Sequence, residues 1–369
     1  MLELPPLALY IHYPWCVKKC PYCDFNSHEL SDSQGYINAL LDDLDDDLSY
    51  VQGRSIHSIF IGGGTPSLMS EKDLSQLFDG LRSRLNFDNE IEITLEANPG
   101  TFEVEKFSAF RNIGVNRLSI GVQSFNNEHL ESLGRIHSAD NAIYACEQAK
   151  QVGFDNFNID LMYGLQNQTI DGCLSDLERA IKLNPTHISF YQLTIEPNTL
   201  FAKFPPILPK ADDIWSMGEQ GISLLTQQGF ERYEVSAFGR IPSKHNLNYW
   251  EFGDYIGIGA GAHGKITSII NQTIIRTLKS KSPKDYIQKR NKTIEVIENT
   301  SFEFMLNALR LKNGFEVELF SKRSGVPINN ICDQLASAKD LGLLEYSDSL
   351  IRPTTKGFNF LNNLQELFL

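Results

Sequence analysis

Apolar strand-like runs alternate with amphipathic helical patterns through the first two thirds of the chain, and this alternation constrains the fold most. Six runs are predicted strands: Leu7–His12, Ile56–Ile61, Ile91–Leu95, Asn116–Gly121, Asn156–Leu161 and His187–Thr194. Six segments have helical spacing: Gln34–Val51, Glu71–Leu85, Glu103–Asn112, Asp140–Val152, Asp171–Leu183 and Ala211–Gln228. This order predicts right-handed βα units around a parallel sheet. Because six units are too few for a closed eight-stranded barrel, we expect an open, partial (βα)6 barrel, with a doubly wound sheet as the alternative.

The pattern changes after Gly229. We predict a strand, an aromatic-rich loop, a glycine-rich segment, a β-hairpin and a polar linker, in that order: Phe230–Phe238, His245–Trp250, Tyr255–His263, Lys265–Leu278 and Lys279–Lys292. The last segment, Ser301–Leu369, is predicted to hold helices and a short β-ribbon in the order of a winged-helix module. We therefore expect a barrel over residues 1–228, a β extension over 229–300 and a helical, winged-helix-like domain over 301–369.

Composition and charge narrow the possible functions. The chain has 369 residues, 41% of them hydrophobic, so it can bury a core and is not expected to be disordered. Its 33 basic and 46 acidic side chains give a net charge of −13, which argues against nucleic acid as a partner. No run of about 18 apolar residues predicts a membrane helix, and the first residues lack the basic start of a signal peptide. Cys146, Cys173 and Cys332 are scattered, so we expect a reduced, cytoplasmic protein with one metal or redox site.

An acidic run lies within the first predicted helix. Its five aspartates surround leucines that keep the spacing of a buried helix face: Asp42, Asp43, Asp45, Asp46 and Asp47. We therefore predict that the aspartates form a solvated face of this helix rather than a metal site.

Three cysteines form the most specific chemical motif. Cys16, Cys20 and Cys23 have the spacing C-x3-C-x2-C and directly follow the first predicted strand. Thiolates suit zinc or an iron–sulfur cluster, and three of them leave one position open for a ligand. The alternative is a structural zinc site completed by His12 or His28.

Polar and glycine residues follow the other predicted strands where each strand ends. Gly62–Pro66 follows the second strand, Glu96 the third and Gln123 the fourth, and Asp160 ends the fifth. Ligands of parallel barrels bind at this end of the strands. Glycines let backbone amides approach a ligand, and carboxylates accept from amines or ribose hydroxyls. Each feature alone is equally compatible with a tight turn, a cap or an ion pair, but together they predict one ligand site.

With its aromatic residue Tyr22 before the third cysteine, the motif resembles that of the radical S-adenosylmethionine (SAM) superfamily. The resemblance implies a [4Fe–4S] cluster held by the three cysteines, with SAM chelated by the fourth iron. It also implies a SAM-site role for residues at the matching positions: Tyr10, Tyr22, Gly63, Gly64, Thr65, Glu96, Gln123, Arg135 and Asp160.

Longer segments, among them FIGGGTPSLM and HNLNYWEFGDYIGIGAGAHGK, resemble the coproporphyrinogen-III-oxidase-like family. That family contains the oxygen-independent oxidase and a haem chaperone branch. The oxidase has a fourth cysteine where this chain has Phe25, and the chaperone branch has the motif H-N-x-x-Y-W, which His245, Asn246, Tyr249 and Trp250 match. Both features point to the chaperone branch.

The resemblance implies a haem site at this motif. His245 would offer an imidazole to the iron, and Tyr249 and Trp250 would cover the porphyrin. Without the resemblance, a packed loop is the simpler reading of a histidine beside aromatic residues. The chain departs from the branch at Ser243, where many members have a cysteine, and at Gln166, where proline is usual. No thiolate can therefore come from position 243.

We thus expect a haem chaperone that delivers haem to respiratory proteins, including acceptors at the membrane surface. The alternative is an enzyme that decarboxylates coproporphyrinogen III without oxygen, using a radical derived from SAM. A third possibility is a zinc-binding module without catalytic activity. The sequence leaves the oligomeric state and the acceptor of the haem open.

Overall fold

One open, twelve-stranded sheet dominates the computed structural model, which describes residues 1–31, 33–100 and 104–369. Its central strands lie side by side in chain order and run parallel: β1 (Leu7–Tyr13), β4 (Ile56–Gly63), β5 (Phe87–Ala97), β6 (Arg117–Gln123), β7 (Asn156–Tyr163) and β8 (His187–Gln192). The strand order does not reverse in the middle of the sheet, as it would in a doubly wound fold. The predicted partial barrel is therefore confirmed, and the doubly wound alternative is wrong.

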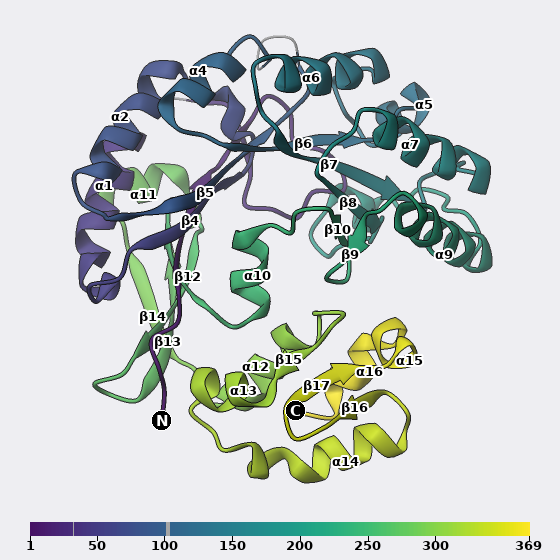
Figure 1. Ribbon diagram of the computed structural model, residues 1–369. Helices are drawn as coiled ribbons and strands as arrows, with labels where there is room; N and C mark the ends of the chain where they lie inside the picture. The colour runs from purple at the N-terminus through teal and green to yellow at the C-terminus, as the bar shows by residue number, and fades with distance from the viewer. Residues whose placement is uncertain (32, 101–103) are drawn as a thin grey trace.

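An arc of helices covers the outer face of this sheet (Figure 1). Its members are α1 (Tyr36–Asp47), α2 (Glu71–Arg82), α4 (Phe107–Ile113), α5 (Asn127–Ser132), α6 (Ala139–Gln151), α7 (Ile170–Lys182) and α9 (Ala211–Gln227). Several begin where a side chain accepts from a free backbone amide; Ser138, for example, forms a capping box with Asn141 at the start of α6. The third predicted helix was expected to begin at Glu103, which lies outside the described residues. A short helix, α8 (Leu200–Lys203), follows β8.

The sheet continues with strands from the second part of the chain. β11 (Asp254–Ile258) pairs parallel with β1, and β12 (His263–Ser268), β13 (Thr273–Lys279) and β14 (Lys292–Val296) follow antiparallel. The predicted hairpin is confirmed as β12 and β13. Strands from both sides of residue 228 thus join one sheet, and the division of the chain at that residue stays a prediction.

Three predictions for this second part are wrong. The strand expected at Phe230–Phe238 is two short strands, β9 (Glu231–Arg232) and β10 (Ala237–Gly239). The expected aromatic loop is a helix, α10 (Lys244–Trp250), because Ser243 caps its first turn. The expected linker contains α11 (Pro283–Lys289), which is capped by Ser282 and has proline in its first turn.

The acidic face of α1 is only partly solvated, so that prediction also needs correction. Asp43 and Asp47 are buried, with 1% and 0% of their surface exposed. The Lys279 ammonium on β13 forms ion pairs with both carboxylates, and Lys292 pairs with Asp47. A helix surface can bury aspartates where a distant strand supplies the opposite charge.

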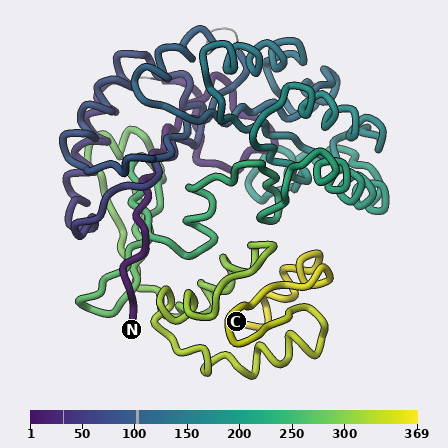
Figure 2. Tube along the Cα trace, viewed as in Figure 1, coloured from purple at the N-terminus to yellow at the C-terminus, as the bar shows by residue number. Residues whose placement is uncertain are grey.

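The C-terminal segment folds into a small lobe on the open side of the arc (Figure 2). Its three-stranded sheet has the order β15 (Phe315–Glu316), β17 (Leu350–Pro353), β16 (Leu344–Tyr346). Its helices are α12 (Thr300–Ala308), α13 (Val317–Ser324), α14 (Cys332–Asp340), α15 (Thr355–Asn359) and α16 (Leu361–Glu366). A separate apolar core, centred on Phe304, holds these elements together and includes Phe252 from the end of α10. The predicted small sheet with helices is confirmed.

Among the described residues, none of the helices has the length and apolarity needed to span a membrane.

Candidate functional site

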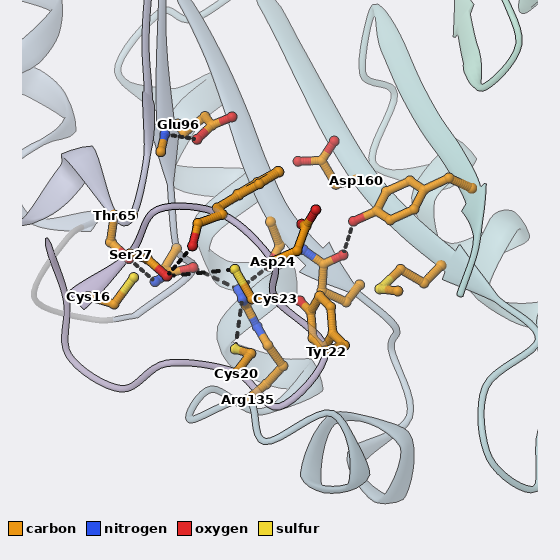
Figure 3. A pocket seen from close by; sticks show the side chains of 18 of the residues that line it. Cys16, Cys20, Tyr22, Cys23, Asp24, Ser27, Thr65, Glu96, Arg135 and Asp160 are labelled. Carbon is orange, nitrogen blue, oxygen red and sulfur yellow. Dashed lines mark hydrogen bonds between the residues drawn. The ribbon is translucent and has the colours of Figure 1, made fainter. Parts of the chain in front are cut away.

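A cavity of about 460 Å³ lies at the carboxyl ends of the parallel strands. Figure 3 shows the side chains that surround it. Its lining includes most of the residues predicted for the cluster and SAM: Cys16, Cys20, Tyr22, Cys23, Gly63, Gly64, Thr65, Glu96, Gln123, Arg135 and Asp160. Its volume is within the range of roughly 300–1,000 Å³ typical of small-molecule and cofactor sites. The fold therefore brings residues from five strands to one cavity.

The cysteine loop is held by a short strand pair. β2 (Trp15–Cys16) pairs with β3 (His28–Glu29), so the loop leaves and returns at the same edge of the barrel. All three thiols are free and partly exposed toward the cavity (Figure 3). Burial raises the pKa of the Cys16 and Cys23 thiols. No three His, Cys, Asp or Glu side chains of the described residues are grouped closely enough to bind a single metal ion.

Arg135 connects the cysteine loop to the strands. Its Nη1 lies 3.8 Å from the Cys20 sulfur, and its Nη2 donates to the Asn98 Oδ1 and the Gly121 carbonyl, both at 2.7 Å. Asn98 in turn donates to the Thr65 hydroxyl at 3.1 Å. The guanidinium is thus fixed beside a thiol, where it can pair with a thiolate or a ligand carboxylate.

Two partly buried carboxyl groups, Glu96 and Asp160, face the cavity (Figure 3). Burial and then the nearby Asp160 raise the pKa of Glu96 to about 8, although the Gly63 amide donates to it at 3.0 Å. Burial also raises the pKa of Asp160, which accepts from Asn158 at 2.7 Å and Ser119 at 3.3 Å. Such a pair favours a ligand that brings positive charge and hydroxyl donors.

The glycine segment packs against the cysteine loop. A Cβ at Gly63, where φ is +112°, would lie 2.4 Å from the His12 ring, and a Cβ at Gly64 would lie 2.5 Å from the Trp15 carbonyl oxygen. The amides of Gly63, Gly64 and Thr65 all donate within the protein, to Glu96, Tyr13 and Trp15. The glycines therefore serve close packing, and their amides are not directed at a ligand as the sequence suggested.

Several lining residues were not singled out from the sequence. Tyr191 donates to the Gln123 Oε1 at 2.7 Å and holds that side chain beside the cavity. Ser119 on the neighbouring strand β6 also lines the cavity and donates to Asp160, and Asn158, two residues before Asp160 on β7, supports the same carboxylate from behind the lining. These residues lie inside the predicted strands Asn116–Gly121, Asn156–Leu161 and His187–Thr194, where uncharged side chains are too common to be distinctive.

A second cavity, of about 900 Å³, adjoins the first. The two share Cys23, Phe25, Gly63 and Glu96 in their linings. Tyr10, which was predicted to lie at the SAM site, lines only the second cavity, where its hydroxyl contacts the His12 Nδ1 at 2.8 Å.

Of the four residues in the predicted haem motif, only Tyr249 lines a cavity, and it is the second one. His245 is 1% exposed and stacks on Phe60; its Nδ1 contacts the Ser58 hydroxyl at 3.0 Å and its Nε2 the Tyr249 hydroxyl at 3.2 Å. Burial lowers the pKa of His245 to about 3. An iron-ligand role for His245 would require one of these two hydrogen bonds to break, and it stays a prediction.

The other two residues of the motif face away from both cavities. Asn246 donates to the Tyr233 hydroxyl at 3.4 Å. Trp250 lies under the Arg310 guanidinium of the C-terminal lobe, 4.3 Å from its ring centre, and its buried Nε1 has no hydrogen-bond partner among the described residues. The motif thus connects the barrel to the C-terminal lobe.

Comparisons with known proteins agree with this geometry. The model of the radical SAM superfamily matches residues 10–180, and that of the HemN C-terminal domain matches residues 298–360. The chain is similar to heme chaperone HemW of Escherichia coli (strain K12), with 48% identity over all of both chains. It is also 48% identical to heme chaperone HemW of Haemophilus influenzae, covering 100% of this chain and 99% of that one.

A solved structure shares the fold. The structure of coproporphyrinogen III oxidase (HemN) from Escherichia coli aligns with a TM-score of 0.82 at 24% identity, over 99% of this chain and 90% of that one. At this identity the likeness shows the fold alone. The family resemblance seen in the sequence is confirmed by the full-length relatives, and the chain belongs to the HemW branch of the radical SAM superfamily.

Proposed function

We propose that the chain is a haem chaperone, which holds a [4Fe–4S] cluster and SAM in the first cavity and delivers haem to respiratory haemoproteins. The observation that carries the proposal is the full-length similarity, at 48% identity, to proteins named heme chaperone HemW. The delivery step and its acceptors rest on the resemblance of the haem motif to that branch.

The residues of the first cavity fit a cluster with SAM. Cys16, Cys20 and Cys23 supply three thiolates, and the cavity beside them leaves room at a fourth iron. His12 is a poor fourth ligand for a zinc ion, because its Nδ1 contacts Tyr10 at 2.8 Å and its Nε2 contacts the Asn26 carbonyl at 2.9 Å. When bound, the cluster supplies an electron for redox chemistry at SAM.

The remaining residues fit the polar parts of SAM. Arg135 would pair with the carboxylate of its amino-acid end, and Glu96 would accept from its amino group. Asp160, held by Asn158 and Ser119, would accept from the ribose hydroxyls. A cationic sulfonium beside the two carboxyl groups would stabilise their ionised forms and so oppose the desolvation that raises the pKa of Glu96.

The proposal can be tested on anaerobically purified protein. We expect the broad visible absorption of an iron–sulfur cluster, which is lost when any of Cys16, Cys20 or Cys23 is replaced by alanine. We also expect saturable binding of haem and, in an equilibrium dialysis, of SAM. A protein that contains zinc, shows no visible absorption and does not bind haem would contradict the proposal and favour the zinc-binding module.

The alternative enzyme activity has a separate readout. Phe25, which is 58% exposed and lines both cavities, stands where the oxidase has a cysteine. We therefore expect no conversion of coproporphyrinogen III in the presence of SAM and a reductant.

A further inference from the structure

We propose that His263, and not His245, provides the axial imidazole for the haem iron, and that the haem lies in the second cavity beside the cluster site. This inference rests on the proposed haem-binding function. It assigns the haem to a particular cavity and the iron to a residue outside the H-N-x-x-Y-W motif. Four observations carry it: the size of the cavity, the state of each histidine ring, the chemistry of the walls and the position of α10.

The second cavity has the dimensions of a large cofactor site. Its volume of about 900 Å³ is near the upper end of the range of roughly 300–1,000 Å³ seen for such sites. Its walls come from β1, β11, β12, α10 and the cysteine loop. The central strand β1 and the extension strands β11 and β12 therefore meet here, and a ligand in this space would contact both parts of the sheet.

Three histidines line this cavity, His12, His28 and His263, and His263 has the most exposed side chain of the three. His12 uses both ring nitrogens, on Tyr10 and on the Asn26 carbonyl. His28 is only partly exposed, and its Nε2 is buried without a hydrogen-bond partner among the described residues. His263, the first residue of β12, is exposed, and neither of its ring nitrogens has a hydrogen-bond partner among the described residues. A metal needs an accessible, unpaired ring nitrogen, so His263 meets the requirement, His12 does not, and His28 offers a less exposed ring of which one nitrogen is enclosed.

His245 has no unpaired ring nitrogen and does not reach either cavity. Its ring nitrogens contact Ser58 and Tyr249, and the side chain is absent from the lining of either cavity. What α10 presents to the second cavity is Tyr249, whose ring packs against Tyr255 at a centroid distance of 4.5 Å. We infer that His245 acts as a positioning residue, which holds the Tyr249 hydroxyl and so shapes the wall.

Part of the wall suits a flat macrocycle that carries carboxylates, whereas Asp24, Glu96 and Glu196 line the rest of the cavity. Tyr10, Tyr249 and Tyr255 provide aromatic surface for packing against the ring. Lys281 is exposed and lines the cavity, and its charge is near enough to act on His263, so its ammonium can pair with a propionate of a haem bound there. Close backbone packing holds His263 in place, because a Cβ at Gly257 would lie 1.8 Å from the His263 carbonyl oxygen.

The test is a haem titration of the full chain, followed by absorption, for wild type and for His263→Ala. His28→Ala is the matched control in the same cavity, and His245→Ala tests the motif. We expect His263→Ala to bind haem at least about tenfold more weakly, which is about 1.4 kcal/mol, and to shift the main absorption band. Added free imidazole should restore the wild-type band, because it can occupy the vacated space. His28→Ala should keep the wild-type band and affinity.

The outcomes separate this inference from the function on which it rests. If wild type does not bind haem, the proposed function fails. If wild type binds and His263→Ala keeps the same affinity and spectrum, the function stands and the assignment to His263 is overturned. A loss confined to His245→Ala, with rescue by imidazole there, would likewise return the iron to the motif. His263→Gln is a second variant that guards against misfolding, because glutamine is polar and position 263 is exposed. It should lose the same haem affinity as His263→Ala.

Discussion

Replacing Lys279 by methionine should be among the most destabilising single changes in the barrel. The Lys279 side chain is 0% exposed and its ammonium is paired with Asp43 and Asp47, whose side chains are each 1% exposed. Methionine has a similar length but no charge, so the variant leaves an excess of negative charge buried between α1 and β13. Asp47 keeps Lys292, whereas Asp43 keeps only hydrogen bonds from Tyr286 and the Gly259 amide.

The expected loss can be bounded. Removing one partner of a buried ion pair costs about 3–5 kcal/mol, because the remaining charge is uncompensated. The ion pair between Asp45 on α1 and Arg84, which follows α2, is the control: the Arg84 and Asp45 side chains are 26% and 44% exposed. Exposed pairs contribute about 0.2–1 kcal/mol, so Arg84→Met should fall in that range.

Urea denaturation gives the free energy of unfolding of both variants. If the dependence of that free energy on urea concentration is unchanged, only stability has changed. Adding Asp43→Asn to Lys279→Met should recover part of the loss, because it removes the unpaired charge. Burial raises the pKa of Asp43, and Lys279 opposes this increase. Without Lys279, Asp43 should therefore bind a proton more readily in the folded state than in the unfolded chain. Stability then rises as pH falls, and the loss should be smaller at about pH 5 than at about pH 7. A loss below about 1 kcal/mol that does not depend on pH would refute this reasoning.

Three further predictions concern the site. Cys20→Ala should remove the visible absorption of the cluster, whereas Cys332→Ala, which changes an exposed cysteine on α14, should leave iron content unchanged. Gly64→Ala should lower cluster occupancy, measured as iron per chain, because its Cβ would lie 2.5 Å from a backbone oxygen at the start of the cysteine loop. Glu92→Gln should lower the free energy of unfolding by about 1–3 kcal/mol, because the Glu92 carboxylate accepts from the Ser243 hydroxyl and the amides of residues 244 and 245. Unchanged stability in that variant would mean that α10 does not depend on Glu92 for its position.

Much of the barrel was predictable because its signals are local. Each parallel strand is a short apolar run, and several of the amphipathic helices begin at a polar cap, so the order of βα units follows from the sequence. The cysteine spacing and the polar strand ends then identified most of the first cavity. The carboxyl ends of neighbouring parallel strands must meet at one edge, whatever the details of packing.

The errors arose where distant parts of the chain decide the structure. β11 was seen only as a glycine-rich segment, because glycine weakens strand propensity. Yet Gly257 must lack a side chain for β12 to approach, and the pairing partner of β11 is β1, more than 240 residues earlier. α10 is seven residues long and is anchored by Glu92 from β5. Short segments held by long-range contacts carry little local signal.

The buried side of α1 has the same explanation. Asp43 and Asp47 are ordinary acidic residues in the sequence, and Lys279 lies more than 230 positions away. Likewise, the ring nitrogens of His245 are occupied by Ser58 and by Tyr249, of which only the second belongs to the motif. A motif identifies residue types in order, but the availability of a ring nitrogen depends on neighbours from other elements.

The central claim is that this radical SAM scaffold binds haem as its cargo and does not make its precursor. The most direct measurement is one anaerobic preparation, loaded with cluster, SAM and reductant, divided between a haem titration and an assay with coproporphyrinogen III. We predict saturable binding of haem with a shifted absorption band, and no formation of protoporphyrinogen. Robust formation of protoporphyrinogen, with haem bound only weakly and without saturation, would contradict the account.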